Sequence, residues 1–107
     1  GVVGISWDIV DSGSNIAYTF SGPGITTGAE NNPQLYLYRG FTYNFVNNSG
    51  SSHPLEIRIS DNGAAYTTGI TGSNIATQTF TVPMIAPSSL YYQCTNYSIM
   101  GNIITIV

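Results

Sequence analysis

The C-terminal end of the chain reads LYYQCTNYSIMGNIITIV (residues 90–107). Its first five residues fit the period of a β-strand, in which successive side chains point to opposite faces. We therefore expect Leu90, Tyr92 and Cys94 to face inward and Gln93 to face outward. The whole stretch predicts a strand, a short loop and a returning strand, with the cysteine sulfur pointing into the core at one pole of the domain.

A second apolar run, Ile103–Val107, predicts a central strand that is buried on both faces. Period-2 alternation with β-branched and aromatic residues recurs through most of the remaining sequence, and no window carries an amphipathic helical stripe. Ala64–Ala76 is the least regular segment and is compatible with a short helical turn or a loop. The predicted strands are Ile5–Val10, Ile16–Ser21, Gln34–Tyr38, Phe41–Asn47, Leu55–Ser60, Thr77–Val82, Leu90–Cys94 and Ile103–Val107.

Clusters of Gly, Pro, Asn, Asp and Ser separate these strands, as expected for turns. Seven or eight short strands at this spacing predict an all-β Greek-key sandwich or a small barrel. A chain of 107 residues and 11.4 kDa can bury one core. We therefore expect residues 1–107 to form a single domain.

Charged residues make up only 7% of the chain, which has no lysine and a formal net charge of −3. Its two basic side chains, Arg39 and Arg58, cannot form the surface that neutralises phosphates, so the composition excludes a nucleic-acid-binding function. The same shortage argues against binding to anionic membrane surfaces, and no apolar run has the length of a membrane span. A hydrophobic content of 42% predicts a folded chain rather than a disordered one.

Few side chains in this sequence can carry polar chemistry. The chain has one histidine (His53), one cysteine (Cys94) and two methionines, and its five carboxylates are scattered. No two carboxylates have a spacing that places both on one strand face, which argues against glycosidase-type acid–base catalysis. A zinc site with Cys₂His₂ or His₃ ligands is excluded because there is one histidine.

Two sulfur-containing residues, Cys94 and Met100, flank the loop between the last two predicted strands. A strand–loop–strand return brings both ends of that loop to the same pole of a sandwich. His53 stands just before the predicted strand Leu55–Ser60 and can project to that pole as well. Thiolate, thioether and imidazole donors suit copper, especially Cu(I), better than any hard cation. His53, Cys94 and Met100 are therefore candidate copper ligands.

The sequence around these residues resembles that of the cupredoxins, the blue-copper β-sandwich family. The resemblance lies in two segments, FVNNSGSSHPLEI (45–57) and YYQCTNYSIMG (91–101). The family pattern has one histidine after an asparagine-containing strand end and then Cys-x-x-His-x-x-Met, or a longer version, near the C-terminus. More narrowly, the second segment is similar to the CTNHSxMG motif of cupredoxin-like domains in structural proteins of marine bacteriophages. The resemblance implies an antiparallel Greek-key β-sandwich with a copper site.

Two residues depart from the pattern that this resemblance implies. Tyr97 stands where the family has its second histidine ligand, and a neutral phenol with a pKa of about 10 is a poor ligand. We expect Tyr97 to pack at the rim or donate a hydrogen bond, with tyrosinate ligation as the minor alternative. Pro54 stands where cupredoxins have a backbone N–H that bonds to the thiolate, and proline has no N–H. That loss is expected to change the redox potential without excluding the metal.

Three classes of function follow. The first is a copper-binding domain that serves in electron transfer or copper carriage and meets a redox partner. The second is a structural or adhesive domain of a phage particle, in a virion or extracellular setting, with a metal-free, degenerate site and other subunits as partners. The third, an enzyme with a Cys94–His53 nucleophile pair, ranks below both, because no oxyanion hole or orienting third group can be identified. We therefore expect a non-enzymatic domain with copper as its candidate cofactor.

Overall fold

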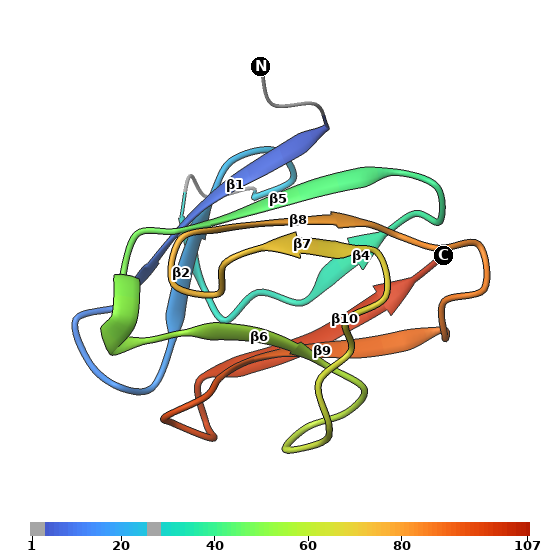
Figure 1. Cartoon of the computed structure of the whole chain (residues 1–107). Coiled ribbons are helices and arrows are strands. Elements are labelled where there is room, and N and C mark those ends of the chain that lie inside the picture. Colours follow the sequence, from blue (N-terminus) through green and yellow to red (C-terminus); the bar gives the residue numbers. More distant parts are fainter. Residues whose placement is uncertain (1–3, 26–28) are drawn as a thin grey trace.

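The computed structural model describes residues 4–25 and 29–107, which form two β-sheets that face each other (Figure 1). The only helical element in these residues is a 3₁₀ turn, η1 (Gly50–Ser52). No helix in this part of the chain has the length and apolar character needed to span a membrane. The strands are β1 (Ile5–Asp11), β2 (Tyr18–Ser21), β3 (Glu30–Asn31), β4 (Leu35–Leu37), β5 (Thr42–Asn47), β6 (Leu55–Arg58), β7 (Ile70–Gly72), β8 (Thr77–Thr81), β9 (Ser89–Cys94) and β10 (Gly101–Ile106).

The larger sheet has the strand order β3–β2–β1–β5–β8–β7. β1 runs parallel to β5, and the other neighbouring pairs of this sheet are antiparallel. Consecutive strands β1 and β2 form a hairpin-like pair, whereas β1 and β5 are joined only after the chain has passed through the other sheet. This crossing of the chain between the sheets holds the two layers together.

The smaller sheet has the order β4–β10–β9–β6, with β10 parallel to β4 and antiparallel to β9. β6 forms one edge of this sheet and runs antiparallel to β9. The first residue of β6, Leu55, pairs with the last residue of β9, Cys94. Segments that precede β6 and follow β9 therefore leave the sheet at the same end.

Aromatic side chains fill much of the space between the sheets. The ring of Trp7 stacks on that of Tyr43 with centroids 5.5 Å apart, and Phe20 of the larger sheet meets Tyr92 of the smaller sheet at 5.0 Å. Removing such apolar area from water stabilises the fold by about 25 cal/mol per Å². The Phe20–Tyr92 pair joins the two sheets across the core.

The predicted all-β sandwich is confirmed, and each predicted strand is present with ends that differ by no more than two residues. Ten strands occur in the described residues, rather than seven or eight, because β3 and β7 are additional. β7 lies within Ala64–Ala76, so that segment extends the larger sheet instead of forming a helical turn. Both extra strands are two or three residues long, which is too short for a periodic pattern.

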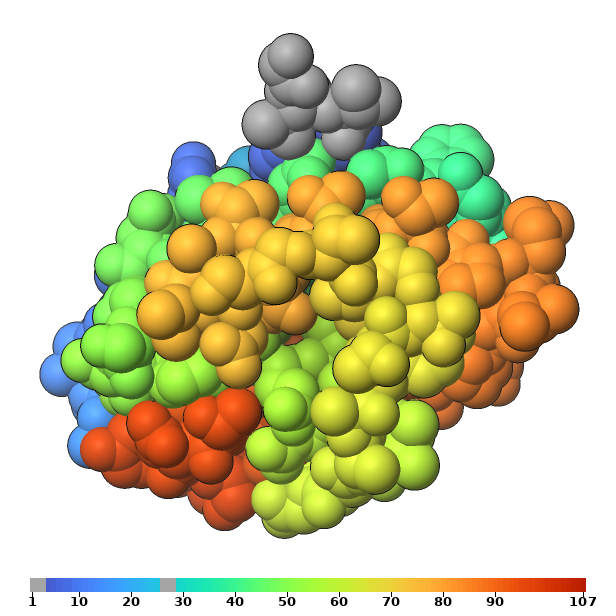
Figure 2. All heavy atoms as spheres, in the orientation of Figure 1, coloured from blue at the N-terminus to red at the C-terminus, as the bar shows by residue number. Residues whose placement is uncertain are grey.

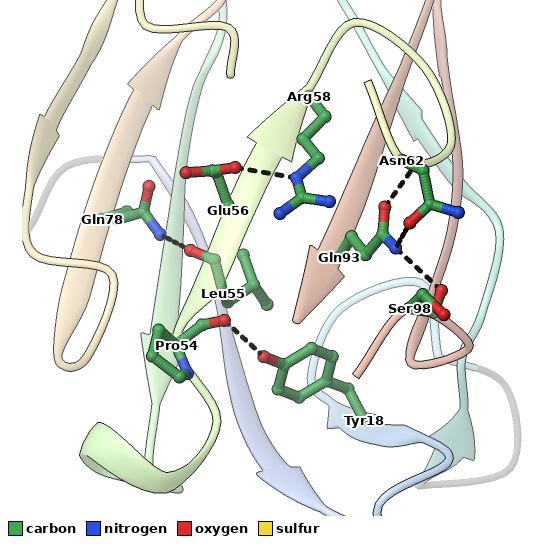
Figure 3. A network of polar contacts seen from close by, with 9 residues as sticks. All are labelled: Tyr18, Pro54, Leu55, Glu56, Arg58, Asn62, Gln78, Gln93 and Ser98. Carbon is green, nitrogen blue, oxygen red and sulfur yellow. Dashed lines mark hydrogen bonds and ion pairs between the residues drawn. The ribbon is translucent and has the colours of Figure 1, made fainter. Parts of the chain in front are cut away.

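Two predictions about burial are wrong. Gln93 is buried rather than solvent-facing, because its side chain is bonded to Asn62 and to the carbonyl of Ser98, from loops that cover this face (Figure 3). β10 is buried on one face only: Ile104 lies in the core, whereas Ile103 is exposed. In this two-layer sandwich one face of the smaller sheet packs against the larger sheet, so a central strand can leave its other face to solvent even when it is rich in isoleucine.

Candidate metal centre

Strand pairing brings distant parts of the chain to one end of the smaller sheet. The loop that follows β9 and the segment that precedes β6 lie side by side on one face of the molecule (Figure 2), where the Asn96 side-chain amide donates to the Ser52 carbonyl at 3.2 Å. The pairing of Leu55 with Cys94 places the start of β6 beside the end of β9, and so places the segment before β6 beside the loop after β9. His53 and Cys94 therefore come together although they are 41 positions apart in the sequence.

The segment between β5 and β6 is folded so that His53 lies inside the domain. At its start, the Oδ1 atom of Asn47 accepts the backbone N–H of Ser49 at 3.0 Å. The chain then turns through η1, where Gly50 adopts a φ of 64° that favours glycine. The N–H of His53 donates to the Gly50 carbonyl at 3.3 Å, which closes the turn. This local structure directs the histidine towards the end of β9.

The backbone around the histidine is held by two buried side chains from the larger sheet. Asn47 donates through Nδ2 to the carbonyls of His53, at 2.8 Å, and Asn74, at 3.0 Å. The Tyr18 hydroxyl donates to the carbonyls of His53, at 2.8 Å, and Pro54, at 3.0 Å; Figure 3 shows the second of these bonds. Hydrogen bonds from two strands therefore fix the position from which the imidazole projects.

The imidazole of His53 faces the only cysteine of the chain. Its Nδ1 atom lies 3.8 Å from the Sγ atom of Cys94, and the two residues are 7% and 1% exposed. Met100 is fully buried in the same apolar cluster as Cys94, and its carbonyl accepts the Cys94 N–H at 2.8 Å. The fold thus collects a thiol, an imidazole and a thioether-bearing residue at one pole.

Tyr97 lies over the outer side of this group. Its ring centroid is 5.3 Å from that of His53, the two rings are inclined by 42°, and Tyr97 is 37% exposed. The Tyr97 carbonyl accepts the N–H of Met100 at 3.1 Å, which makes the loop compact. The tyrosine ring is therefore in contact with the histidine and with solvent, at the rim of the pole.

The donor atoms fit a soft first-row metal ion. For zinc, bonds to nitrogen are about 2.0 Å and bonds to sulfur about 2.3 Å, so atoms 3.8 Å apart can both reach one ion of that size. Within residues 4–25 and 29–107, no group of three or more His, Cys, Asp and Glu side chains is arranged to hold a metal. Sets of thiolate, thioether and imidazole donors favour copper over hard cations.

The same burial weakens the enzymatic alternative. A cysteine nucleophile has to meet its substrate, and catalytic cysteines are found in partly exposed surroundings. Cys94 is covered by the loop that ends at Met100 and by the imidazole of His53. This burial argues against the Cys94–His53 nucleophile pair.

The sequence does not point to three residues that shape this pole: Tyr18, Asn47 and Gln93. Asn47 belongs to the asparagine-containing strand end on which the family resemblance partly rests, so a weak signal exists for it. Tyr18 has no local signal, because its bonding partner His53 is 35 positions away. Gln93 likewise bonds to Asn62, which is 31 positions away. Long-range polar partners of this kind become visible only in the folded chain.

Solved structures of amicyanin and rusticyanin superpose on almost the whole chain. A proline-to-glycine mutant of amicyanin, in its reduced Cu(I) form at pH 4, gives a TM-score of 0.56 at 16% identity and covers 100% of this chain and 85% of its own. Reduced rusticyanin gives a TM-score of 0.53 at 18% identity, with 99% of this chain and 82% of that chain covered. The chain has the cupredoxin fold. A methionine-to-glutamine mutant of rusticyanin gives 0.51 at 18% identity and covers 98% of this chain and 80% of its own.

No family model and no curated protein sequence matches the chain. At identities of 16 to 18%, the structural likeness establishes the cupredoxin fold and leaves the ligands to be argued from the residues themselves. The buried His53 near Cys94 and Met100 resembles part of a type 1 copper site.

The first prediction concerns the hydrogen bonds that hold the histidine segment in this cupredoxin fold. Replacing Asn47→Ala removes the two bonds that its Nδ2 atom donates to the His53 and Asn74 carbonyls and the bond that its Oδ1 atom accepts from Ser49, and the loss of these bonds should lower the free energy of unfolding by about 1–3 kcal/mol. The matched control is Asn48→Ala, at an exposed neighbouring position, which should cost about 0.5 kcal/mol or less. Urea unfolding measures both. Equal losses in the two variants would contradict the role assigned to Asn47.

Proposed function

We propose that this domain binds copper through His53, Cys94 and Met100, holds Cu(I) more tightly than Cu(II), and serves in electron transfer or copper carriage. The observation that carries the proposal is the 3.8 Å approach of the His53 Nδ1 atom to the Cys94 Sγ atom inside a buried pole. A neighbouring fold described as a Cu(I) form of amicyanin is consistent with it.

Each candidate ligand has a separate task in this proposal. Cys94 would bind as a thiolate and provide the one negative charge of the set, while His53 would bind through the Nδ1 atom that faces the sulfur. Met100 would add a weak thioether contact from the far end of the loop. Copper bound in this way supplies a one-electron couple. Burial keeps bulk water from the thiolate and limits its oxidation.

The preference for Cu(I) follows from the composition of the ligand set. One imidazole and two sulfur donors are softer than the two imidazoles and one thiolate of a blue-copper plane, and soft donors favour the cuprous ion. Tyr97 occupies the position of the missing imidazole in the sequence pattern, and its ring packs against His53. A phenol keeps its proton up to a pKa of about 10 in water and does not substitute for an imidazole.

The second prediction tests metal binding directly. Under anaerobic conditions, the native protein should take up one equivalent of Cu(I) in competition with a chromogenic Cu(I) chelator. Cys94→Ser removes the only thiolate and should weaken the affinity by roughly 100-fold or more, and His53→Gln and Met100→Leu should weaken it by smaller factors. Met84→Leu is the matched control, because Met84 is 73% exposed and lies outside the core cluster.

Circular dichroism of each variant shows whether the fold is retained. A native protein that keeps its fold and takes up no Cu(I) would refute the proposal. The alternative would then apply: a structural or adhesive domain, such as one from a phage particle, with a degenerate and metal-free pole. Unchanged affinity in Cys94→Ser would show that copper binds elsewhere.

The third prediction concerns the position that departs from the family pattern. Replacing Tyr97→His supplies a second imidazole beside His53, and Cu(II) should then give a strong thiolate-to-copper band in the visible spectrum. The native protein should give this band faintly or not at all. Because Tyr97 is partly exposed, the substitution should cost about 1–2 kcal/mol of stability at most. Tyr36→His, at an exposed tyrosine of β4, controls for the added histidine.

Absorption spectra after addition of Cu(II) to the three proteins provide the comparison. If only Tyr97→His gives the band, the result supports the proposal that Cys94 and His53 bind copper and that the added imidazole completes a blue-copper ligand set. A colourless Tyr97→His protein with an intact fold would mean that the pole is no longer a copper site. A band of equal strength in Tyr36→His would show that any added histidine suffices.

A further inference from the structure

A groove lies between two edge strands, where Figure 2 shows the surface of the molecule hollowed. One of these strands is β6, at the edge of the smaller sheet, and the other is β7, at the edge of the larger sheet. The groove has a volume of about 410 Å³, which is large enough for a small molecule. None of the candidate copper ligands lines it, so it is a separate feature of the domain.

Hydrogen bonds across this groove hold its two sides together. The Tyr66 N–H donates to the Ile57 carbonyl at 2.8 Å, and the Leu55 N–H donates to the Asn74 carbonyl at 2.9 Å. Gln78 of β8 adds a third link, from its Nε2 atom to the Leu55 carbonyl. The fold itself therefore sets the shape of the groove, and little further ordering is needed when a ligand binds.

Two side-chain oxygens that border the groove accept no hydrogen bond from the described residues. Gln78 is 7% exposed, and its only side-chain bond is the one that Nε2 donates. No fully buried side-chain nitrogen or oxygen in this part of the chain lacks a partner, so the Oε1 atom of Gln78 is reached from the groove. Glu56 pairs with Arg58 through Oε1 at 2.7 Å, and Figure 3 shows its second oxygen directed away from Arg58. Both free oxygens suit a ligand that donates hydrogen bonds.

The remaining lining narrows the chemical class of that ligand. Hydroxyl groups of Thr67 and Ser73 can donate or accept, and Tyr66 and Ile70 add apolar surface. Glu56 is the only charged residue of the lining, and its ion pair with Arg58 balances that charge. One carboxylate that already has a cationic partner is a poor site for a metal ion. A matching ligand is uncharged, carries several hydroxyl groups and has an apolar face.

We propose that this groove binds a neutral carbohydrate. Sugar hydroxyls donate to the free oxygens of Glu56 and Gln78, and the C–H face of the sugar ring packs on the Tyr66 side chain. Each sugar hydroxyl also accepts hydrogen bonds, which the hydroxyls of Thr67 and Ser73 can supply. Because the groove is separate from the metal pole, this binding does not depend on copper.

Nuclear magnetic resonance titration of isotope-labelled protein with methyl glycosides of glucose, mannose and galactose tests the proposal. At least one glycoside should bind with a dissociation constant of about 1 mM, the order expected for a ligand of this size. Its addition should shift the resonances of the Gln78 side-chain amide and the Gly72 backbone, which line the groove. Tetrahydropyran, which has the ring without the hydroxyls, should bind far more weakly.

Two outcomes of this titration would overturn the proposal. One is the absence of any shift at the groove with all three glycosides. The other is binding of tetrahydropyran, or of the blocked peptide unit N-acetylalanine methylamide, that is as tight as binding of the best glycoside.

Matched variants locate the bound sugar. Thr67→Trp places a large ring in the groove and should weaken glycoside binding by about 10-fold or more, whereas Thr68→Trp, at the next exposed position outside the lining, should change it by about twofold at most. Glu56→Gln removes the charged acceptor and should weaken binding by about 10-fold, and Asp61→Asn, at an exposed carboxylate outside the groove, is its control. Equal effects within either pair would contradict the assignment.

Circular dichroism shows whether each variant is folded. If Glu56→Gln does not fold, the two threonine variants still decide the question, because both positions are exposed. Cys94→Ser should bind the glycosides as native protein does, whatever the result with copper. Loss of glycoside binding in a folded Cys94→Ser protein would place the sugar at the metal pole and refute the proposal.

Discussion

Leu55 pairs with Cys94 where β6 meets β9, and this register sets how close the histidine two positions earlier can come to the cysteine sulfur. A slip of one residue would turn every side chain of β6 to the opposite face. The register is held by Ile57, which is buried and pairs with the buried Tyr92 farther along the same strands. The burial of Ile57 and Tyr92 therefore fixes the pairing of β6 with β9, and this pairing positions His53 and Cys94.

Polar groups at the pole are hydrogen-bonded within the protein itself. Among the described residues, no buried side-chain nitrogen or oxygen lacks a hydrogen-bond partner. Burying a polar group is unfavourable unless it is hydrogen-bonded, so Asn47, Gln93 and Tyr18 can lie inside because each one serves backbone groups of neighbouring loops. The resulting network fixes the loops on both sides of His53 and Cys94. Preorganisation of this kind lowers the ordering cost of binding.

The sequence predicts the parts of this arrangement that depend on local pattern. Alternation predicts Cys94 at the inner end of its strand, and spacing predicts that Met100 returns to the same pole. Short strands such as β7 are not predicted, because two or three residues are too few to show an alternation of buried and exposed side chains. Gln93 bonds to Asn62 as well as to the nearby Ser98, and Tyr18 bonds to His53; Asn62 and His53 are each more than thirty positions away, so local pattern does not encode these contacts. Sequence therefore predicts which residues meet at the pole better than it predicts the polar side chains that hold the surrounding loops in place.

The proposed function requires the buried imidazole and thiol at this pole to hold the same metal ion. X-ray absorption at the copper edge of Cu(I)-loaded native protein measures the atoms bound to the ion most directly. We expect scattering from sulfur together with one imidazole, which is the result for copper bound by Cys94, His53 and Met100. A copper ion surrounded only by nitrogen and oxygen atoms would contradict it.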